Sequence, residues 1–244
     1  MYQFFVESSQ IGCDTVSITG SDYNHITHVL RMKAGERIRV SDREGNSYFC
    51  VIQSFLEDQV LASIESRDEV GTELGNRIYL YQGLPKSEKM ELIIQKAVEL
   101  GVYEVIPVTM KNCVMKLEEK KIPQKIARWQ AIAESAAKQS KRTIVPVVRE
   151  PMSYKLALEQ AKDLDLVLVP YENERGMQAT REILSHIERG QSIGIFIGPE
   201  GGFADSEIEA LPEGMHRISL GRRILRTETA GLATLSMLVY ELDD

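Results

Sequence analysis

Apolar and polar residues alternate over short stretches in the first 65 residues, which is the pattern of half-buried β-strands. Turn residues separate several of these stretches, and positions 42–46 (DREGN) have the composition of a hairpin turn. The predicted strands are 2–6, 15–18, 37–40, 48–55 and 60–65. Regular spacing of such strands predicts a small β-barrel.

One helix interrupts these strands. Its apolar residues recur at helical spacing from Tyr23 to Leu30, and Ser21 or Asp22 is the predicted cap. The helix ends in the segment HVLRMK, in which Arg31 and Lys33 precede a glycine turn.

The pattern changes after a charged, glycine-containing stretch at 66–76 (SRDEVGTELGN), which we interpret as a linker between two domains, 1–70 and 77–244. Apolar strands then alternate with amphipathic helices, which predicts an α/β domain built on a parallel sheet. The predicted strands are 77–82, 104–108, 144–148, 164–169, 193–197 and 217–220. The predicted helices are 90–100, 119–142, 153–162 and 177–189, with a short helical piece after position 204 and an apolar helix at the C-terminus.

Two predicted strands near the C-terminus end in glycine-marked loops, and a helix follows each loop. The first loop reads GPEGGF at 198–203 and the second reads GRRILR at 221–226. A third loop, Pro170-Tyr171-Glu172, follows the predicted strand 164–169. Because ligands in open α/β sheets bind beyond the carboxyl ends of the strands, we expect the three loops to meet at one pocket.

The first loop does not match the glycine-rich fingerprints that bind phosphate. Asp205, Glu207 and Glu209 follow it, and acidic residues at a helix N-terminus would repel a phosphate. Ser206 or Asp205 is the predicted cap of that helix, and Thr227 or Thr229 is the predicted cap of the last one. Taken alone, the glycines are equally compatible with a tight structural turn.

Charge is distributed unevenly along the 244 residues, whose formal net charge is −7. Positions 73–150 hold 14 basic and 9 acidic residues, whereas the segments before and after them are acidic. Phosphate binding depends on local clusters rather than on total charge, so a nucleic-acid partner is compatible with this chain. Solvated helix surfaces would give the same composition.

The three cysteines are far apart and show neither metal-ligand spacing nor a disulfide framework, which suits a reducing cytoplasm. His25 and His28 lack a third ligand, so we expect no metal site. No apolar run is long enough to cross a bilayer, and the N-terminus lacks the pattern of a signal peptide.

The pairing of GPEGGF at 198–203 with LGRRILRTETA at 220–230 resembles the 16S ribosomal RNA uridine-N3 methyltransferase family of the SPOUT superfamily. The HVLR segment at 28–31 is similar to one in the PUA-like RNA-binding barrel of that family. The resemblance implies an N-terminal PUA-like barrel and a C-terminal α/β domain with a deep trefoil knot, a feature that hydrophobic patterning could not reveal. It also implies S-adenosylmethionine as the methyl donor and a homodimer. The apolar C-terminal helix is a candidate interface, and burial of that helix in its own core is equally compatible with the sequence.

The resemblance implies that backbone and apolar groups of the three loops enclose the methyl donor. The implied cofactor-binding residues are Val169, Pro170, Ile197, Gly198, Pro199, Gly201, Gly202, Ile218, Leu220, Gly221, Ile224, Leu225, Thr229 and Ala230. For catalysis, Arg226 is the first choice for a cation that stabilises a uracil anion, and Glu200 and Glu228 are candidate bases or orienting groups. Both glutamates could equally cap helices or pair with arginines.

RNA contacts are expected at basic and polar positions that match the family pattern. The implied residues are Arg31, Lys33, Lys86, Lys89, Lys96, Gln139 and Arg142. Lys138 departs from the acid expected at its position, which leaves the role of that position open. The partner would be 16S ribosomal RNA, free or in an assembled small subunit.

Two other functions are compatible with the same residues. One is a related methyltransferase acting on ribose 2′-oxygen or transfer RNA, and the other is a non-enzymatic RNA-binding module with a vestigial pocket. The PUA-like start and the full 220–230 motif favour the uridine-N3 family over the first.

Overall fold

The computed structural model describes residues 1–86 and 89–243, and its contacts divide the chain into two compact units. The N-terminal unit holds residues 1–73 together with 137–145, and the C-terminal unit holds 74–136 and 146–244. The division passes through the stretch expected to be a linker. The sequence pattern did not indicate that 137–145 would join the N-terminal unit.

The N-terminal unit is a five-stranded sheet in the order β1-β3-β4-β5-β2. Its strands are β1 (Tyr2–Phe5), β2 (Thr15–Thr19), β3 (Arg37–Ser41), β4 (Ser47–Phe55) and β5 (Gln59–Arg67). β1 pairs with β3 in parallel, and the other pairs are antiparallel. Alternate residues of these strands, such as Ile38, Val40 and Ile52, fill a common core. All five strands lie where the alternation predicted them.

The helix in this unit differs from its prediction. α1 (Gly20–Asn24) begins after Thr19, so neither Ser21 nor Asp22 is its cap. It continues as one π-helical turn (His25–Val29) that buries Ile26 and leaves Val29 largely exposed. The periodicity identified a helix but assumed a regular pitch, which the π turn breaks.

The C-terminal unit is a parallel sheet in the order β12-β10-β11-β6-β7-β8, with the short β9 pairing to β7. Its strands are β6 (Arg77–Gly83), β7 (Glu104–Thr109), β8 (Val147–Val148), β9 (Met152–Ser153), β10 (Leu166–Pro170), β11 (Ser192–Ile197) and β12 (Met215–Ile218). The helices are α2 (Lys89–Glu99), α3 (Ile122–Ser140), α4 (Tyr154–Ala161), α5 (Gln178–Leu184), α6 (Asp205–Glu209) and α7 (Thr227–Leu242), and α3 extends into the N-terminal unit.

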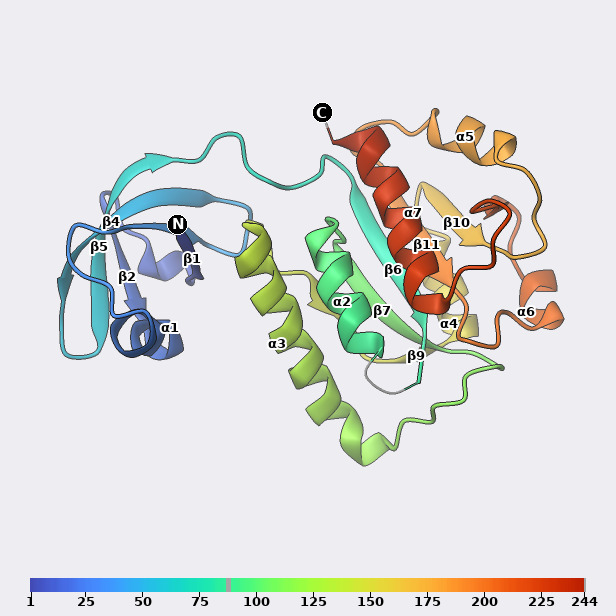
Figure 1. Ribbon diagram of the computed structural model, residues 1–244, viewed down its shortest axis with the longest axis horizontal. Helices are drawn as coiled ribbons and strands as arrows, with labels where there is room; N and C mark the ends of the chain where they lie inside the picture. The colour runs from blue at the N-terminus through green and yellow to red at the C-terminus, as the bar shows by residue number, and fades with distance from the viewer. Residues whose placement is uncertain (87–88, 244) are drawn as a thin grey trace. The chain divides into compact units, whose positions relative to one another are not determined.

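Helices cover both faces of this sheet (Figure 1). α2 and α7 pack against each other on one face, and α4 packs on the other against a core that includes Tyr81 and Phe196. Trp129 is buried in α3 and packs in the interior. The predicted parallel α/β domain is therefore confirmed.

Three local predictions in this unit are wrong. Helical spacing predicts that Leu92, Ile93, Ala97 and Leu100 share the packed face of α2. The residues buried in α2 are instead Met90, Ile93, Ile94, Ala97 and Val98, and Leu92 is 45% exposed. The cap of α6 is Ala204, whose N–H donates to the Glu207 carboxylate, rather than Asp205 or Ser206. The cap of α7 is Arg226, because the Thr227 side chain is turned to other partners.

No helix in the described part of the chain is both long and apolar enough to cross a membrane.

Candidate functional site

The loops after β10, β11 and β12 meet at one cavity of about 530 Å³ in the C-terminal unit. These three strands are neighbours and parallel, so their carboxyl ends lie at the same edge of the sheet. α7 begins beside the same cavity and contributes Thr227 and Ala230 to its lining. The volume lies within the roughly 300–1,000 Å³ that small-molecule sites enclose.

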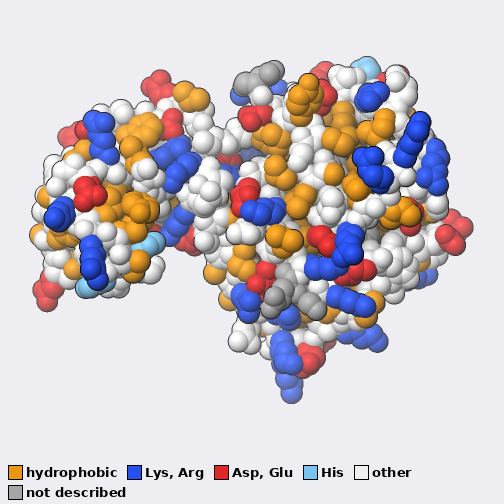
Figure 2. Space-filling view, viewed as in Figure 1, with side chains coloured by type: hydrophobic (Ala, Val, Ile, Leu, Met, Phe, Trp, Pro, Cys, Tyr) orange, Lys and Arg blue, Asp and Glu red, His pale blue; other side chains and the backbone are white. Residues whose placement is uncertain are grey.

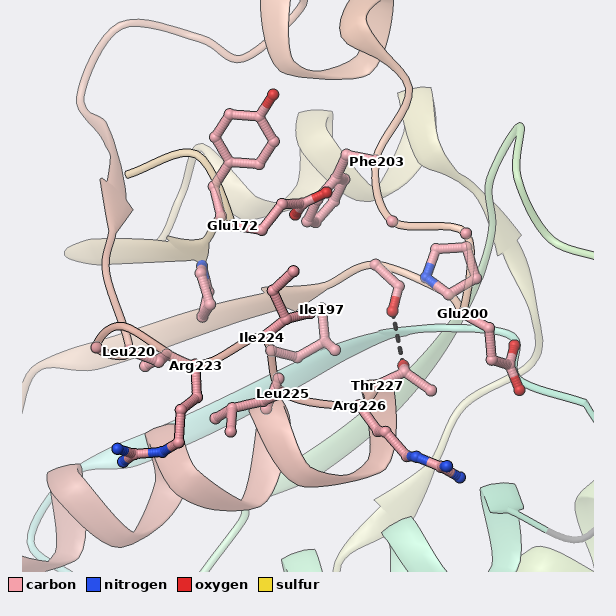
Figure 3. A pocket seen from close by; sticks show the side chains of 18 of the residues that line it. Glu172, Ile197, Glu200, Phe203, Leu220, Arg223, Ile224, Leu225, Arg226 and Thr227 are labelled. Atoms are coloured by element: carbon pink, nitrogen blue, oxygen red, sulfur yellow. Dashed lines mark hydrogen bonds between the residues drawn. The ribbon is translucent and has the colours of Figure 1, made fainter. Parts of the chain in front are cut away.

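Apolar side chains form one side of the cavity. Ile197 comes from the end of β11, and Leu220, Ile224 and Leu225 come from the loop after β12. Figure 3 shows these four side chains together, with Glu172 and Phe203 across the cavity from them. An apolar slot faced by a carboxylate and by loop backbone can hold a flat, partly polar ligand.

The glycines of the 198–203 loop are required by close approaches of the backbone. A Cβ on Gly198 would lie 3.1 Å from the Gly202 carbonyl carbon. Gly202 has a φ of +66°, and a Cβ there would lie 2.8 Å from a Glu172 carboxylate oxygen. The loop is thus folded tightly against the cavity, and larger residues at these positions would displace its walls.

A charged cluster lies at the rim where α2 and α7 begin. Lys89 Nζ lies 3.2 Å from Glu200 Oε1 and 3.2 Å from Glu228 Oε2, and Glu200 Oε1 also accepts the Lys86 backbone N–H at 2.9 Å. The two carboxylates raise the pKa of Lys89. Partial burial alone would raise the pKa of Glu200 and of Glu228, but backbone N–H groups and Lys89 outweigh it, and both pKa values are lowered. All three groups are therefore charged at neutral pH.

Arginines surround the opening of the cavity. Arg175, Arg222, Arg223 and Arg226 line it, and all four are exposed. Figure 2 shows Lys and Arg side chains gathered over the loop that leads into α7. The side chains of Arg223 and Arg226 point away from the apolar residues in Figure 3. This rim suits an anionic molecule arriving from solvent.

Most residues predicted to bind the cofactor do line the cavity. They are Pro170, Ile197, Gly198, Pro199, Gly201, Gly202, Leu220, Gly221, Ile224, Leu225 and Ala230. Val169 and Ile218 are buried within their strands, and Thr229 is exposed on α7, so these three are outside the lining. Of the predicted catalytic residues, Glu200 and Arg226 line the cavity and Glu228 reaches it through Lys89.

The predicted RNA contacts fall in both units. Arg31, Lys33 and Gln139 are exposed in the N-terminal unit, and Lys86 is exposed in the C-terminal unit. Lys96 pairs with Glu99 on the surface of α2, and Lys89 belongs to the charged cluster at the cavity.

The position of Arg142 contradicts its predicted role as an RNA contact. Its side chain is only 4% exposed and forms an ion pair with Glu73, and its backbone carbonyl accepts a hydrogen bond from Gln3. A guanidinium held in this way cannot contact an RNA phosphate, so its role is structural.

Lining residues that the sequence prediction did not assign include Glu172, Arg175 and Phe203. Glu172 could have been found, because it lies in the third loop that was expected at the pocket. Phe203 could also have been found, because it ends the GPEGGF motif at 198–203, whereas Arg175 carries no sequence signal. Among the described residues there is no cluster of three potential metal ligands.

Comparison with known proteins identifies the family of the chain. Residues 72–239 match the family model described as an RNA methyltransferase domain, and residues 18–65 match the RNA methyltransferase PUA domain. The chain belongs to this RNA methyltransferase family. It is 38% identical to the ribosomal RNA small subunit methyltransferase E of Bacillus subtilis, over all of this chain and 98% of that protein. It is 34% identical to the protein of the same name from Mesomycoplasma hyopneumoniae, over 99% of this chain and all of the other.

Solved structures of this RNA methyltransferase family share the whole fold. One is the ribosomal RNA small subunit methyltransferase E of Neisseria gonorrhoeae bound to S-adenosyl methionine, with a TM-score of 0.83 and 28% identity over 98% of this chain and 97% of that one. Another is a putative methyltransferase of Legionella pneumophila with bound cofactor SAM, with a TM-score of 0.84 and 29% identity over the same shares. The two expected domain types, PUA-like and methyltransferase, are therefore confirmed.

Proposed function

We propose that this protein is an S-adenosylmethionine-dependent methyltransferase that methylates N3 of one uridine in 16S ribosomal RNA. The observation that carries the proposal is the convergence of three loops, distant in sequence, on one cavity with an apolar side and a glycine-built side. Relatives over the full length act, by their names, on ribosomal RNA of the small subunit.

The cavity fits the methyl donor in size and chemistry. Ile197, Ile224 and Leu225 offer an apolar surface for an adenine ring, and the tight backbone at Gly198 to Gly202 leaves room for a ligand close to the main chain. The Glu172 carboxylate faces this space and complements a positively charged group. The bound donor supplies an electrophilic methyl group on a sulfonium.

The N3 proton must pass to solvent water or hydroxide, because nitrogen attacks the methyl group as the uracil anion, and the protein assists by stabilising that anion. Transfer forms the N3–carbon bond and breaks the sulfur–carbon bond, and the anion and the sulfonium become neutral together. Arg226 is the cation we assign to the anion, since its exposed side chain lines the cavity that the uracil would enter. Glu200 and Glu228 are poor bases, because their pKa values are lowered and Lys89 holds them ionised. We therefore assign them an orienting role.

RNA would contact exposed basic groups of both units. Arg31 and Lys33 in the PUA-like unit and Lys86 near the cavity are exposed cations suited to phosphate. We further propose that the enzyme acts in the cytoplasm as a homodimer. Support for the dimer comes from α7, where Leu232, Met237 and Val239 are only partly buried while Leu235 and Leu238 are buried within the unit.

Isothermal calorimetry with S-adenosylmethionine tests the cofactor assignment. We expect binding heat at one site per chain, which Ile224→Asp abolishes by placing a charge against the apolar surface. A non-enzymatic RNA-binding module with a vestigial pocket would give no heat with the unmodified protein.

The modified position is tested by mapping methylated nucleosides in ribosomal RNA from a strain that lacks the gene. We expect one N3-methyluridine to disappear from 16S RNA and to return when the purified enzyme is added. Loss of a 2′-O-methyl group or of a transfer RNA modification would contradict the assignment. Parallel reactions on free 16S RNA and on small subunits would identify which of them is the substrate.

A further inference from the structure

A buried chain of hydrogen bonds connects the middle of the sheet to the first residue of the 198–203 loop. Gln82, in β6, is fully buried, and its Nε2 donates to Thr227 Oγ1 at 2.9 Å. The Thr227 hydroxyl donates in turn to the Gly198 carbonyl at 2.6 Å, the bond drawn in Figure 3. Gln82 itself does not line the cavity, whereas Thr227 and Gly198 do.

The direction of this chain is fixed by its last acceptor. A carbonyl oxygen can only accept, so the single hydroxyl proton of Thr227 is given to Gly198. Thr227 can then only accept from Gln82, which requires the amide nitrogen of Gln82 to face it. The same nitrogen also donates to the Gly83 carbonyl at 3.1 Å.

Gln82 is a costly residue for a strand interior. Its Oε1 is buried and has no hydrogen-bond partner among the described residues. A buried polar atom without a partner destabilises a fold, and an apolar side chain of similar shape would avoid that cost. Stability of the sheet therefore does not explain why an amide occupies this site.

The hydrogen bonds from Gln82 through Thr227 instead fix the orientation of one peptide unit of the 198–203 loop. The Gly198 carbonyl precedes Pro199, which has no N–H, so this carbonyl is the only polar group by which the protein can hold that unit. Asn112 holds the far end of the loop, where its Nδ2 donates to the carbonyls of Gly201 and Gly202. Between these two anchors lies the backbone that lines the cavity.

We propose that Gln82 and Thr227 are positioning residues that hold the 198–203 loop in the shape that accepts the cofactor. This inference rests on the proposed function, because it assigns a role in binding S-adenosylmethionine. Without these hydrogen bonds, the 198–203 loop of the cofactor-free protein occupies other conformations. Part of the free energy of cofactor binding is then used to restore the conformation that accepts the cofactor.

Thr227→Val tests the proposal, because valine keeps the shape of threonine and removes the hydroxyl. We expect calorimetry to show about tenfold weaker S-adenosylmethionine binding, because the Gly198 carbonyl loses its donor and the loop must be ordered when the cofactor binds. KM for the cofactor should rise by the same factor, while kcat at saturating cofactor stays within about twofold. Thr227→Ser keeps the hydroxyl and should restore binding to within about twofold.

Thr234→Val is the matched control on the same helix. Thr234 is fully buried, and its hydroxyl donates within α7 to the Ala230 carbonyl at 2.9 Å, away from the loop. Thr234→Val should lower the midpoint of thermal unfolding slightly and leave the affinity for the cofactor unchanged. If it weakens binding as much as Thr227→Val does, the effect is general to the helix and the proposal is overturned.

Gln82→Met provides a second test should Thr227→Val fail to fold. Methionine fills the space without a donor, so we expect about threefold weaker cofactor binding in a folded protein. Unchanged binding in every folded variant of Gln82 and Thr227, with the unmodified protein binding normally, would overturn the positioning role alone. No binding by the unmodified protein would instead overturn the proposed function.

Discussion

The arginines buried in the N-terminal unit and those exposed at the cavity of the C-terminal unit serve different purposes. In the N-terminal unit Arg39 and Arg142 are buried and paired with Asp68 and Glu73. In the C-terminal unit three arginines of the loop before α7, numbered 222, 223 and 226, are exposed around a cavity. A buried pair holds segments together, whereas a solvated guanidinium keeps its charge available to an incoming phosphate or anion. Residue type alone does not distinguish these two roles.

The largest expected effect is on the stability of the N-terminal unit. Arg142→Ala leaves the Glu73 carboxylate, which also accepts the backbone N–H groups of Thr143 and Ile144, without its cation. We expect the free energy of unfolding in urea to fall by about 3 kcal/mol. Arg37→Ala is the control, since its pair with Glu65 is largely exposed and its loss should cost less than about 1 kcal/mol. Similar losses for the two variants would remove the distinction between buried and exposed arginines.

The next effect is on catalysis at the rim of the cavity. Arg226→Ala should lower kcat about 100-fold, because the uracil anion loses its stabilising charge, while the Kd of S-adenosylmethionine changes by less than about threefold. Single-turnover methylation and calorimetry measure the two quantities. Arg181→Ala removes an exposed arginine of α5 outside the cavity and should change neither. Equal losses of rate and affinity in Arg226→Ala would give this residue a binding role instead.

A third prediction concerns how the rim arginines are held in place. Thr180 of α5 is buried, donates to the Ser219 carbonyl at 3.0 Å and accepts the Ser219 N–H at 3.1 Å, just before the arginine loop. Thr180→Val should lower the free energy of unfolding by about 2 kcal/mol and weaken cofactor binding severalfold. Thr180→Ser should behave as the unmodified protein in thermal unfolding and in calorimetry. A loss of stability with unchanged cofactor affinity would show that the loop does not depend on this anchor.

The smallest effect is expected at an exposed lysine. Lys86→Glu should weaken RNA binding severalfold and reduce the dependence of log K on log salt by about 0.7, the value for one phosphate contact on a single strand. Filter binding across a range of salt concentrations measures both. Lys155→Glu on α4 makes the same charge change at another exposed site and should alter neither value by as much. A salt dependence that Lys86→Glu leaves unchanged would exclude a phosphate contact at this residue.

The sequence predicted the elements well because strand alternation and helix periodicity depend on neighbours along the chain. It identified the three loops of the site for a related reason: parallel strands place their carboxyl ends together, so strands followed by glycine turns indicate an edge where a ligand can bind. The predicted knot remains a prediction, since threading is not encoded in local pattern.

The errors arise where distant residues compete for a side chain. Threonine is a favoured residue type at helix caps, but the Thr227 hydroxyl is hydrogen-bonded to the Gly198 carbonyl and to Gln82 instead. Arg142 matched a motif associated with RNA, but Glu73 lies close enough to bury it. The predicted stripe of α2 was right for Ile93 and Ala97 and wrong for Leu92, which is as apolar as the residues that pack, so only contact with the sheet decides between them.

The contribution of residues 137–145 to the N-terminal unit has a consequence for how the protein is made. Glu73 is translated 69 positions before Arg142. At 5–20 residues per second, roughly 3–14 s pass between the synthesis of Glu73 and the synthesis of the arginine that pairs with it. A gene fragment ending at the apparent boundary would encode the five strands without the segment that neutralises Glu73. The N-terminal unit can therefore be completed only after residues 74–136 of the methyltransferase unit have been synthesised, and before the rest of that unit.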